Sequence, residues 1–184
     1  MNIIKTELEE VLIIEPRVFS DNRGIFFESY NKERYLSDVV NREFVQDNIS
    51  VSKKNVLRGL HYQLKHPQGK LVSVLEGEVF DVAVDIRKGS PTFGQWTCAI
   101  LSAENRRQLY VPENFAHGFC VLSNTAIFSY KCTAGYAPGD EYTLMYSDPD
   151  VGINWPCEKP RLSDKDKVGL SLVELENNLP IYNG

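Results

Sequence analysis

The feature of this 184-residue sequence that most constrains its fold is a series of short apolar runs, each bounded by turn-forming residues. Examples of the runs are VLIIEPRVF, KLVSVL, EVFDVAVDI, WTCAILS and GFCVLS, and examples of the boundaries are DNRG, HPQG, RKGSPTFG and APGD. Apolar segments of strand length with turn signals roughly every 8 to 12 residues are typical of all-β sandwiches and barrels. The pattern therefore predicts an all-β protein.

Strand and helix periodicities refine this prediction. EVFDVAVDI alternates with a period of two, which places four apolar side chains on one face of a strand: Phe80, Val82, Val84 and Ile86. A helix is predicted over about residues 32–40, with Asn31 as its N-cap and an apolar stripe formed by Tyr35, Leu36, Val39 and Val40. A second short helix is predicted from about Asp164 onward. Together these elements predict a jelly-roll β-barrel or sandwich with a few short helices.

Length, charge and cysteine content limit the class of protein. Residues 1–184 fit a single domain with its own core. A net charge of −5 argues against general nucleic-acid binding, although a local basic pocket can still bind an anion. No apolar run is long enough to predict a membrane span, and MNIIKTELEE is acid-rich where a signal peptide is apolar. The cysteines form no CxxC pair, so we expect mostly buried, reduced thiols in a cytoplasmic protein: Cys98, Cys120, Cys132 and Cys157.

Two of the three histidines lie in strand-like segments beside small residues, His61 in RGLHYQ and His117 in FAHGF. The third, His66, lies in a turn and is expected to be exposed. Inward-facing histidines in a small β-barrel suggest a cupin, whose metal sites use an HxH motif, a glutamate and a further histidine. Here the motif is HYQ, and Gln63 is a poor substitute for imidazole at a transition metal. His61 is thus open to three interpretations: metal ligand, proton-transfer base or structural histidine.

The same segments contain the parts of a metal-free proton-transfer site. Neutral imidazole is a suitable base because its unperturbed pKa lies near neutrality. Lys70 follows His61 across a predicted turn, and its ammonium would stabilise a developing enolate. Tyr130 in FSYKC is a candidate acid for the opposite face of the substrate. Each side chain is also compatible with a solvated or core position, so the pattern alone does not assign the chemistry.

Arginines and amides supply candidate anion ligands, since no P-loop or GxGxxG motif is present. In a regular strand Arg58 and His61 would face opposite sides of the sheet. A β-bulge at Gly59 is predicted, because it would bring both side chains into one cavity. The further candidates for phosphate and sugar hydroxyls are Arg23, Gln46, Asp47 and Asn48.

Six segments occur in order along the chain: FSDNRGIFFE, FVQDNISVSKKNVLRGLHYQ, PQGKLVSVLEGEVFDVAVDIRKGSPTFG, LSAENRRQLYVPENFAHGF, YKC and LSDKD. Together they resemble the dTDP-4-dehydrorhamnose 3,5-epimerase family. The resemblance implies a cupin-type jelly roll, a homodimer with exchanged N-terminal strands, and neither a metal nor an organic cofactor. It also implies a dTDP-4-keto-6-deoxyhexose substrate, namely dTDP-4-dehydro-6-deoxyglucose, which is epimerised at C3 and C5 to dTDP-4-dehydrorhamnose.

The resemblance assigns catalytic roles to matching positions. His61 resembles the base that removes the protons beside the C4 ketone, and Asp166 in LSDKD resembles the carboxylate that orients its ring. Tyr130 resembles the acid that protonates the opposite face. Lys70 and, less directly, His117 resemble the groups that stabilise the enolate oxygen.

Binding positions carry over in the same way. Arg23 and Glu28 resemble a substrate contact that the partner subunit lends. Tyr136 resembles the tyrosine that stacks on thymine. The nucleotide and diphosphate contacts match Gln46, Asp47, Asn48 and Arg58, and two further binding positions match Glu141 and Lys165.

The sequence departs from the family pattern near the expected thymine site. The usual adjacent tyrosines are replaced by Gly135 and Tyr136, and Tyr142 and Tyr146 stand where the family has glycine and tryptophan. These changes leave alternatives to the two-centre epimerase: inversion of C3 or C5 alone in a related dTDP-4-keto-6-deoxyhexose, a non-catalytic nucleotide-sugar-binding cupin, or a metal-dependent cupin that Gln63 disfavours.

Overall fold

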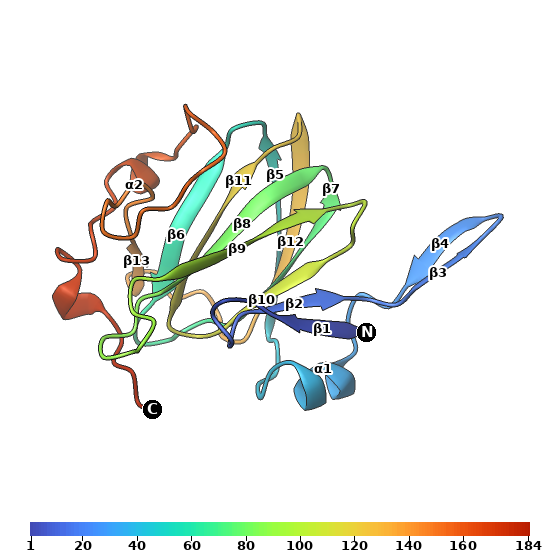
Figure 1. Ribbon diagram of the computed structural model, residues 1–184, viewed down its shortest axis with the longest axis horizontal. Helices are drawn as coiled ribbons and strands as arrows, with labels where there is room; N and C mark the ends of the chain where they lie inside the picture. The colour runs from blue at the N-terminus through green and yellow to red at the C-terminus, as the bar shows by residue number, and fades with distance from the viewer.

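The computed structural model describes residues 1–184, and most of its elements form two facing antiparallel sheets (Figure 1). The first sheet consists of β1 (Asn2–Lys5), β2 (Leu12–Glu15), β10 (Gln108–Val111), β7 (Lys70–Glu76), β12 (Thr125–Cys132) and β5 (Gln46–Lys53), in that order. The second consists of β13 (Glu141–Thr143), β6 (Leu57–Gln63), β11 (Phe115–Val121), β8 (Glu78–Asp85) and β9 (Trp96–Ser102). The sheets stay open at their edges, so the predicted all-β fold takes its sandwich form.

The core fills three spaces, and β8 shows how one strand serves two of them. Val79 and Ala83 point between the sheets, into a cluster that also contains Phe119 and Phe128. Their alternating neighbours, Phe80, Val82, Val84 and Ile86, share the other face as predicted. That face is covered by the chain from Leu144 to Leu179, so both sides of β8 are buried. The third cluster joins α1 to the outer face of the first sheet.

Two short helices and one turn of 3₁₀-helix complete the fold. Helix α1 (Lys32–Asp38) begins at Asn31, whose Oδ1 accepts a 3.1 Å hydrogen bond from the Arg34 amide. It buries Tyr35 against the first sheet, as the predicted apolar stripe requires. Helix α2 (Asp164–Lys167) has only four residues, and the 3₁₀ turn covers Glu176–Asn178. No helix has the length and apolarity needed to span a bilayer.

The hairpin of β3 (Val18–Asp21) and β4 (Gly24–Phe27) projects from the sandwich as an arm (Figure 1). Its two strands pair only with each other. The arm exposes 51% of Phe19, 51% of Ile25 and 71% of Phe26. These large apolar side chains therefore pack against little of their own chain.

All four cysteines are free thiols, as predicted. Cys120 and Cys132 are buried, whereas Cys98 and Cys157 are partly exposed. The pKa of the Cys120 thiol is raised by burial and by its hydrogen bond to Cys157.

Candidate active site

A bulge in β6 brings Arg58 and His61 to the same side of the strand. In the pairing with β11, His61 lies opposite His117 and Arg58 lies opposite Phe119, so β6 has one residue more than its partner over this interval. Gly59 has a φ of +124°, and a Cβ there would lie 2.6 Å from the Gly118 Cα. The predicted bulge at Gly59 is therefore confirmed, and both side chains line one cavity.

That cavity has a volume of about 310 Å³ and lies between the two sheets. Its walls come from β5, β7 and β12 of one sheet and from β6, β11 and β13 of the other. Nine of the residues predicted from sequence line it: Gln46, Asn48, Arg58, His61, Lys70, His117, Tyr130, Tyr136 and Glu141. The lining residues that the sequence did not single out are Ser50, Gln68, Gly118, Phe119 and Phe128.

His61 is held from outside the cavity by Asp166. Its Nε2 lies 2.5 Å from Asp166 Oδ1, and the other carboxylate oxygen accepts a 2.8 Å hydrogen bond from Ser163. Ser163 also caps α2 by accepting from the Asp166 amide, which fixes the carboxylate at the start of this short helix. The nitrogen that Asp166 leaves free is Nδ1. An S-x-x-D spacing, similar to a capping box, was the local signal for Ser163.

The charges around His61 set its protonation. Burial lowers the pKa of His61, and the hydrogen bond to Asp166 opposes this without cancelling it. Burial alone would raise the pKa of Asp166, but the hydrogen bonds from His61 and Ser163 outweigh it and hold that pKa below its usual value. The ring is thus neutral at neutral pH and lies beside an ionised carboxylate, which is the arrangement of a general base with its orienting partner.

Glu141 lines the same wall of the cavity and is paired with Lys165. Glu141 Oε1 lies 3.9 Å from His61 Nδ1, and Glu141 also forms an ion pair with Lys165. Burial would raise the pKa of Glu141, but the Lys165 ammonium and His61 lower it below its usual value. Lys165 does not line the cavity and contacts it only through Glu141.

The opposite wall carries Tyr130 on β12 and Lys70 on the adjacent strand β7. Burial raises the pKa of Tyr130, so its phenol is a proton donor at neutral pH. Burial lowers the pKa of Lys70, while Cys132, Glu141 and Asp81 act in the opposite direction. The Lys70 side chain lines the cavity, where its ammonium is placed to stabilise an oxyanion.

A second carboxylate–histidine pair is formed by Asp81 and His117, and His117 lines the same cavity. His117 Nε2 lies 2.9 Å from Oδ1 of Asp81, a fully buried side chain on β8. Burial raises the pKa of Asp81, against the effect of His117. The sequence analysis did not select Asp81. The available signal was an acid at an inward position of an otherwise apolar strand, between Val79 and Ala83.

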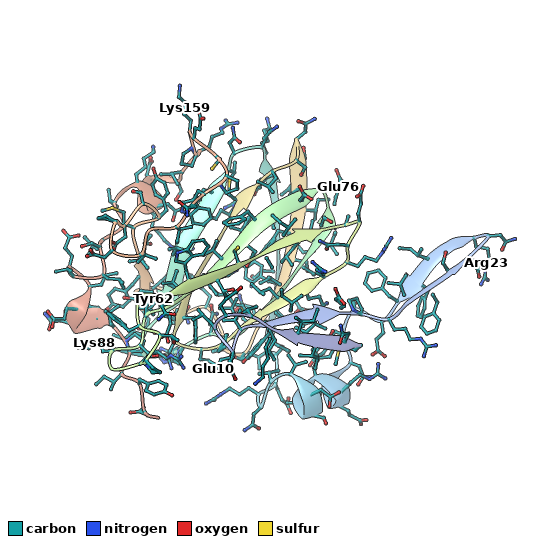
Figure 2. The ribbon with its side chains drawn as sticks, viewed as in Figure 1. Glu10, Arg23, Tyr62, Glu76, Lys88 and Lys159 are labelled. Carbon is teal, nitrogen blue, oxygen red and sulfur yellow. The ribbon has the colours of Figure 1, made fainter.

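Besides Lys165, three predicted binding residues lie outside the cavity of their own chain. Asp47 is on the outer face of β5, where it pairs with Lys131 at 2.9 Å. Arg23 is at the tip of the arm, far from the sandwich (Figure 2), with 86% of its side chain exposed, and it pairs with Asp21. Glu28 follows β4 and pairs with Arg34. Their roles in substrate binding remain predictions.

The departures from the family pattern fall in different places. Tyr142 stacks on Tyr62 with ring centroids 5.5 Å apart, in the core cluster on the other side of the second sheet. Tyr146 contacts Trp155 through its backbone carbonyl, and neither tyrosine lines the cavity. Gly135 is adjacent to the cavity-lining Tyr136, and a Cβ there would meet only the Gln46 side chain, at 4.0 Å. Only the change at Gly135 therefore alters the surroundings of the cavity directly.

His66 is exposed in its turn, as predicted, with 65% of its side chain accessible and Asp140 as its partner. Histidine, cysteine and acidic side chains form no cluster of three or more with metal-binding geometry. A metal-binding HxH motif would have its second histidine at residue 63. Here that residue is a glutamine, which forms hydrogen bonds with backbone atoms of two loops.

Comparison with known proteins decides the family. The model of the dTDP-4-dehydrorhamnose 3,5-epimerase family matches residues 5–174. The chain belongs to this family. A dTDP-4-dehydrorhamnose 3,5-epimerase of Shigella flexneri is 56% identical over 179 residues, which is 96% of this chain and 98% of the relative.

Two solved epimerase structures are similar to this chain along nearly its whole length. A dTDP-6-deoxy-D-glucose-3,5-epimerase of Legionella pneumophila, crystallised with dTDP-4-keto-L-rhamnose, has a TM-score of 0.97 and 54% identity over 100% of this chain and 99% of that one. A 3′-monoepimerase of Streptomyces bikiniensis, in complex with dTDP-quinovose, has a TM-score of 0.91 and 34% identity over 96% of this chain and 92% of that one. The predicted cupin-type jelly roll is thereby confirmed for this 3,5-epimerase family member.

Proposed function

We propose that this protein is an isomerase that converts dTDP-4-dehydro-6-deoxyglucose to dTDP-4-dehydrorhamnose by inverting C3 and C5. The observation that carries the proposal is the placement of His61 and Tyr130 on opposite sheets, facing one cavity. Inversion requires that a proton leave one face of a carbon and that another arrive at the opposite face. A base and an acid on facing walls supply both transfers without rotation of the sugar.

The chemistry follows from the C4 ketone, which acidifies the hydrogens on both neighbouring carbons. His61 takes a proton from C5 or C3. The C–H electron pair then forms a double bond between that carbon and C4, and the carbonyl π pair moves to the C4 oxygen to give an enolate. Tyr130 then donates its phenolic proton to the same carbon from the other face, the ketone re-forms, and solvent restores both protonation states. Lys70 stabilises the enolate oxygen, with His117 beside it, and Asp166 holds the His61 ring in orientation.

No step in this scheme needs a metal or an organic cofactor, and proton exchange tests the proposal directly. Chelator-treated protein is incubated with dTDP-4-dehydro-6-deoxyglucose in D₂O while NMR follows the sugar protons. Exchange at C3 and C5 supports the proposal, and His61→Ala is expected to abolish both because one base serves both centres. Activity that returns only with added metal would falsify the metal-free mechanism.

A narrower epimerase is the second candidate, favoured by the likeness to a 3′-monoepimerase and by the open space beside Gly135. In the same experiment this enzyme exchanges one centre only. A non-catalytic nucleotide-sugar-binding protein binds dTDP but exchanges neither. The number of exchanging protons therefore separates all three candidates.

The arm supports the further proposal of a homodimer with exchanged N-terminal strands. Besides the arm, the outer face of the first sheet exposes Ile49 (66%), Val51 (64%) and Leu75 (57%). An exposed apolar arm and an exposed apolar face on the same chain would let each copy pack its arm on the face of the other. In such a dimer Arg23, at the tip of the arm, would contact substrate in the partner's cavity.

Mixing inactive variants tests which chain uses Arg23. Arg23→Ala and His61→Ala are purified separately, unfolded together and refolded. If Arg23 acts in the partner's site, each mixed dimer contains one complete site, so activity returns on mixing. If Arg23 acts within its own chain, no mixed dimer has a complete site and activity stays absent. Light scattering measures whether the protein is a dimer.

We also propose a cytoplasmic location, which is supported by the free thiols and the acidic charge of the chain.

A further inference from the structure

The side chain of Gln63 joins two loops at the mouth of the cavity. It is 4% exposed and follows His61 on β6 with the same orientation. Its Nε2 donates to the carbonyl oxygens of His66, at 2.7 Å, and Gly135, at 3.2 Å. Its Oε1 accepts from the Ala137 amide at 2.9 Å. One buried amide thus satisfies three backbone groups, two of which flank Tyr136.

Only a carboxamide meets this set of partners. Two carbonyls and one N–H require two donors and one acceptor on the same planar group, which glutamine provides. A glutamate accepts from Ala137 but has no hydrogen for the two carbonyls, and an imidazole cannot donate twice from one nitrogen. The position that would be the second metal ligand of an HxH motif is here used for loop structure.

The loop held by Gln63 carries Tyr136, whose own hydrogen bonds involve only its backbone amide and its hydroxyl group. The Tyr136 amide donates to Gln46 Oε1 at 2.8 Å, and its hydroxyl donates to Glu141 Oε2 at 3.2 Å. The ring itself is 55% exposed and lines the cavity, so little packing restrains it. Its direction depends on the backbone at residues 135 and 137, the two positions bonded to Gln63.

We propose that Gln63 is a positioning residue that holds Tyr136 in place for the nucleobase end of the substrate. This inference rests on the proposed function, in which Tyr136 stacks on thymine. Gln63 does not touch the reacting atoms, so its loss affects binding of the nucleotide and leaves the proton transfers at His61 and Tyr130 intact. A stacked base raises affinity by on the order of 10- to 100-fold, and loss of its positioning removes part of that gain.

The test compares Gln63→Met, which keeps the volume but loses all three bonds, with Gln63→Glu, which keeps only the acceptor. Both are expected to raise KM for the dTDP-sugar and Kd for dTDP by on the order of 10-fold, while kcat changes less than about 3-fold. Tyr62→Phe is the matched control, because Tyr62 is also 4% exposed on β6 but donates to the Asn178 carbonyl on the opposite face. It is expected to lower the melting temperature and leave KM unchanged.

A double-mutant cycle shows whether Gln63 acts through Tyr136. In a Tyr136→Ala background, Gln63→Glu is expected to add no further increase in Kd for dTDP. Additive losses, an unchanged Kd in both Gln63 variants, or a fall in kcat at constant KM would overturn the inference. Because Kd for dTDP is measured without turnover, a wild type that exchanges neither sugar proton refutes the proposed function and still leaves the test of Gln63 valid.

Discussion

Gly59→Ala is the substitution that most directly tests how β6 builds the site. A methyl group at this position would lie 2.6 Å from the Gly118 Cα and 2.8 Å from the His117 carbonyl oxygen. Both are backbone atoms of the paired strand β11, so neither can move aside as a flexible side chain would. The residue also has a φ of +124°, a conformation that L-amino acids rarely adopt.

Each effect has a separate cost. Overpacking a tight contact costs about 1–3 kcal/mol, and a non-glycine residue in this backbone region costs about 1–3 kcal/mol more. The expected loss is therefore about 2–6 kcal/mol of a typical total near 5–15 kcal/mol. At about 2–4 °C per kcal/mol for a chain of this size, the melting temperature is expected to fall by roughly 4–24 °C.

Gly89→Ala is the matched control, because Gly89 has a φ of +85° but no atom within 4 Å of the added methyl group. It carries only the backbone cost, about 1–2 kcal/mol. Thermal unfolding followed by circular dichroism measures both variants, and the D₂O exchange assay measures their activity. If the Gly59→Ala protein folds, we expect the Arg58 side chain to turn away from the cavity and KM to rise. A Gly59→Ala protein with the melting temperature of Gly89→Ala and wild-type KM would refute the bulge as the element that builds the site.

Two further predictions concern the protonation of the site. Asp166→Asn removes the interaction that raises the pKa of His61, so the acid limb of the kcat/KM profile should move to lower pH. The value of kcat should also fall on the order of 10²-fold. A pH–rate profile whose acid limb stays at the wild-type pH would contradict this prediction. Lys70→Met should reduce kcat by on the order of 10²–10³, because it removes the ammonium proposed to stabilise the enolate oxygen. Since burial lowers the pKa of Lys70, the wild-type rate should fall with rising pH below 10.5, and steady-state kinetics should show that limb absent in Lys70→Met.

The helix, the strands and the two histidine segments are properties of local sequence. Asn31 caps α1 because its side chain reaches an amide three residues away, and β8 alternates because strand geometry has a period of two. The bulge was predictable for a similar reason: a glycine lay between two side chains that a regular strand would separate. Each of these inferences depends on neighbours within a few residues of one another.

Other features depended on strands that are far apart in sequence. Asp166 meets His61 across 105 residues, and without the resemblance to a known family no spacing in the chain indicates that contact. Strand alternation separates Asp47 from Gln46 and Asn48, but only the packing of the sheets decides that the Asp47 side of β5 faces away from the cavity. The carboxylate of Asp81 likewise meets His117 only when β8 and β11 pair. Local sequence determined which residue types and strands were available, through propensity and periodicity. Tertiary structure decided which of them face one cavity, because that depends on sheet pairing and on which face the core occupies.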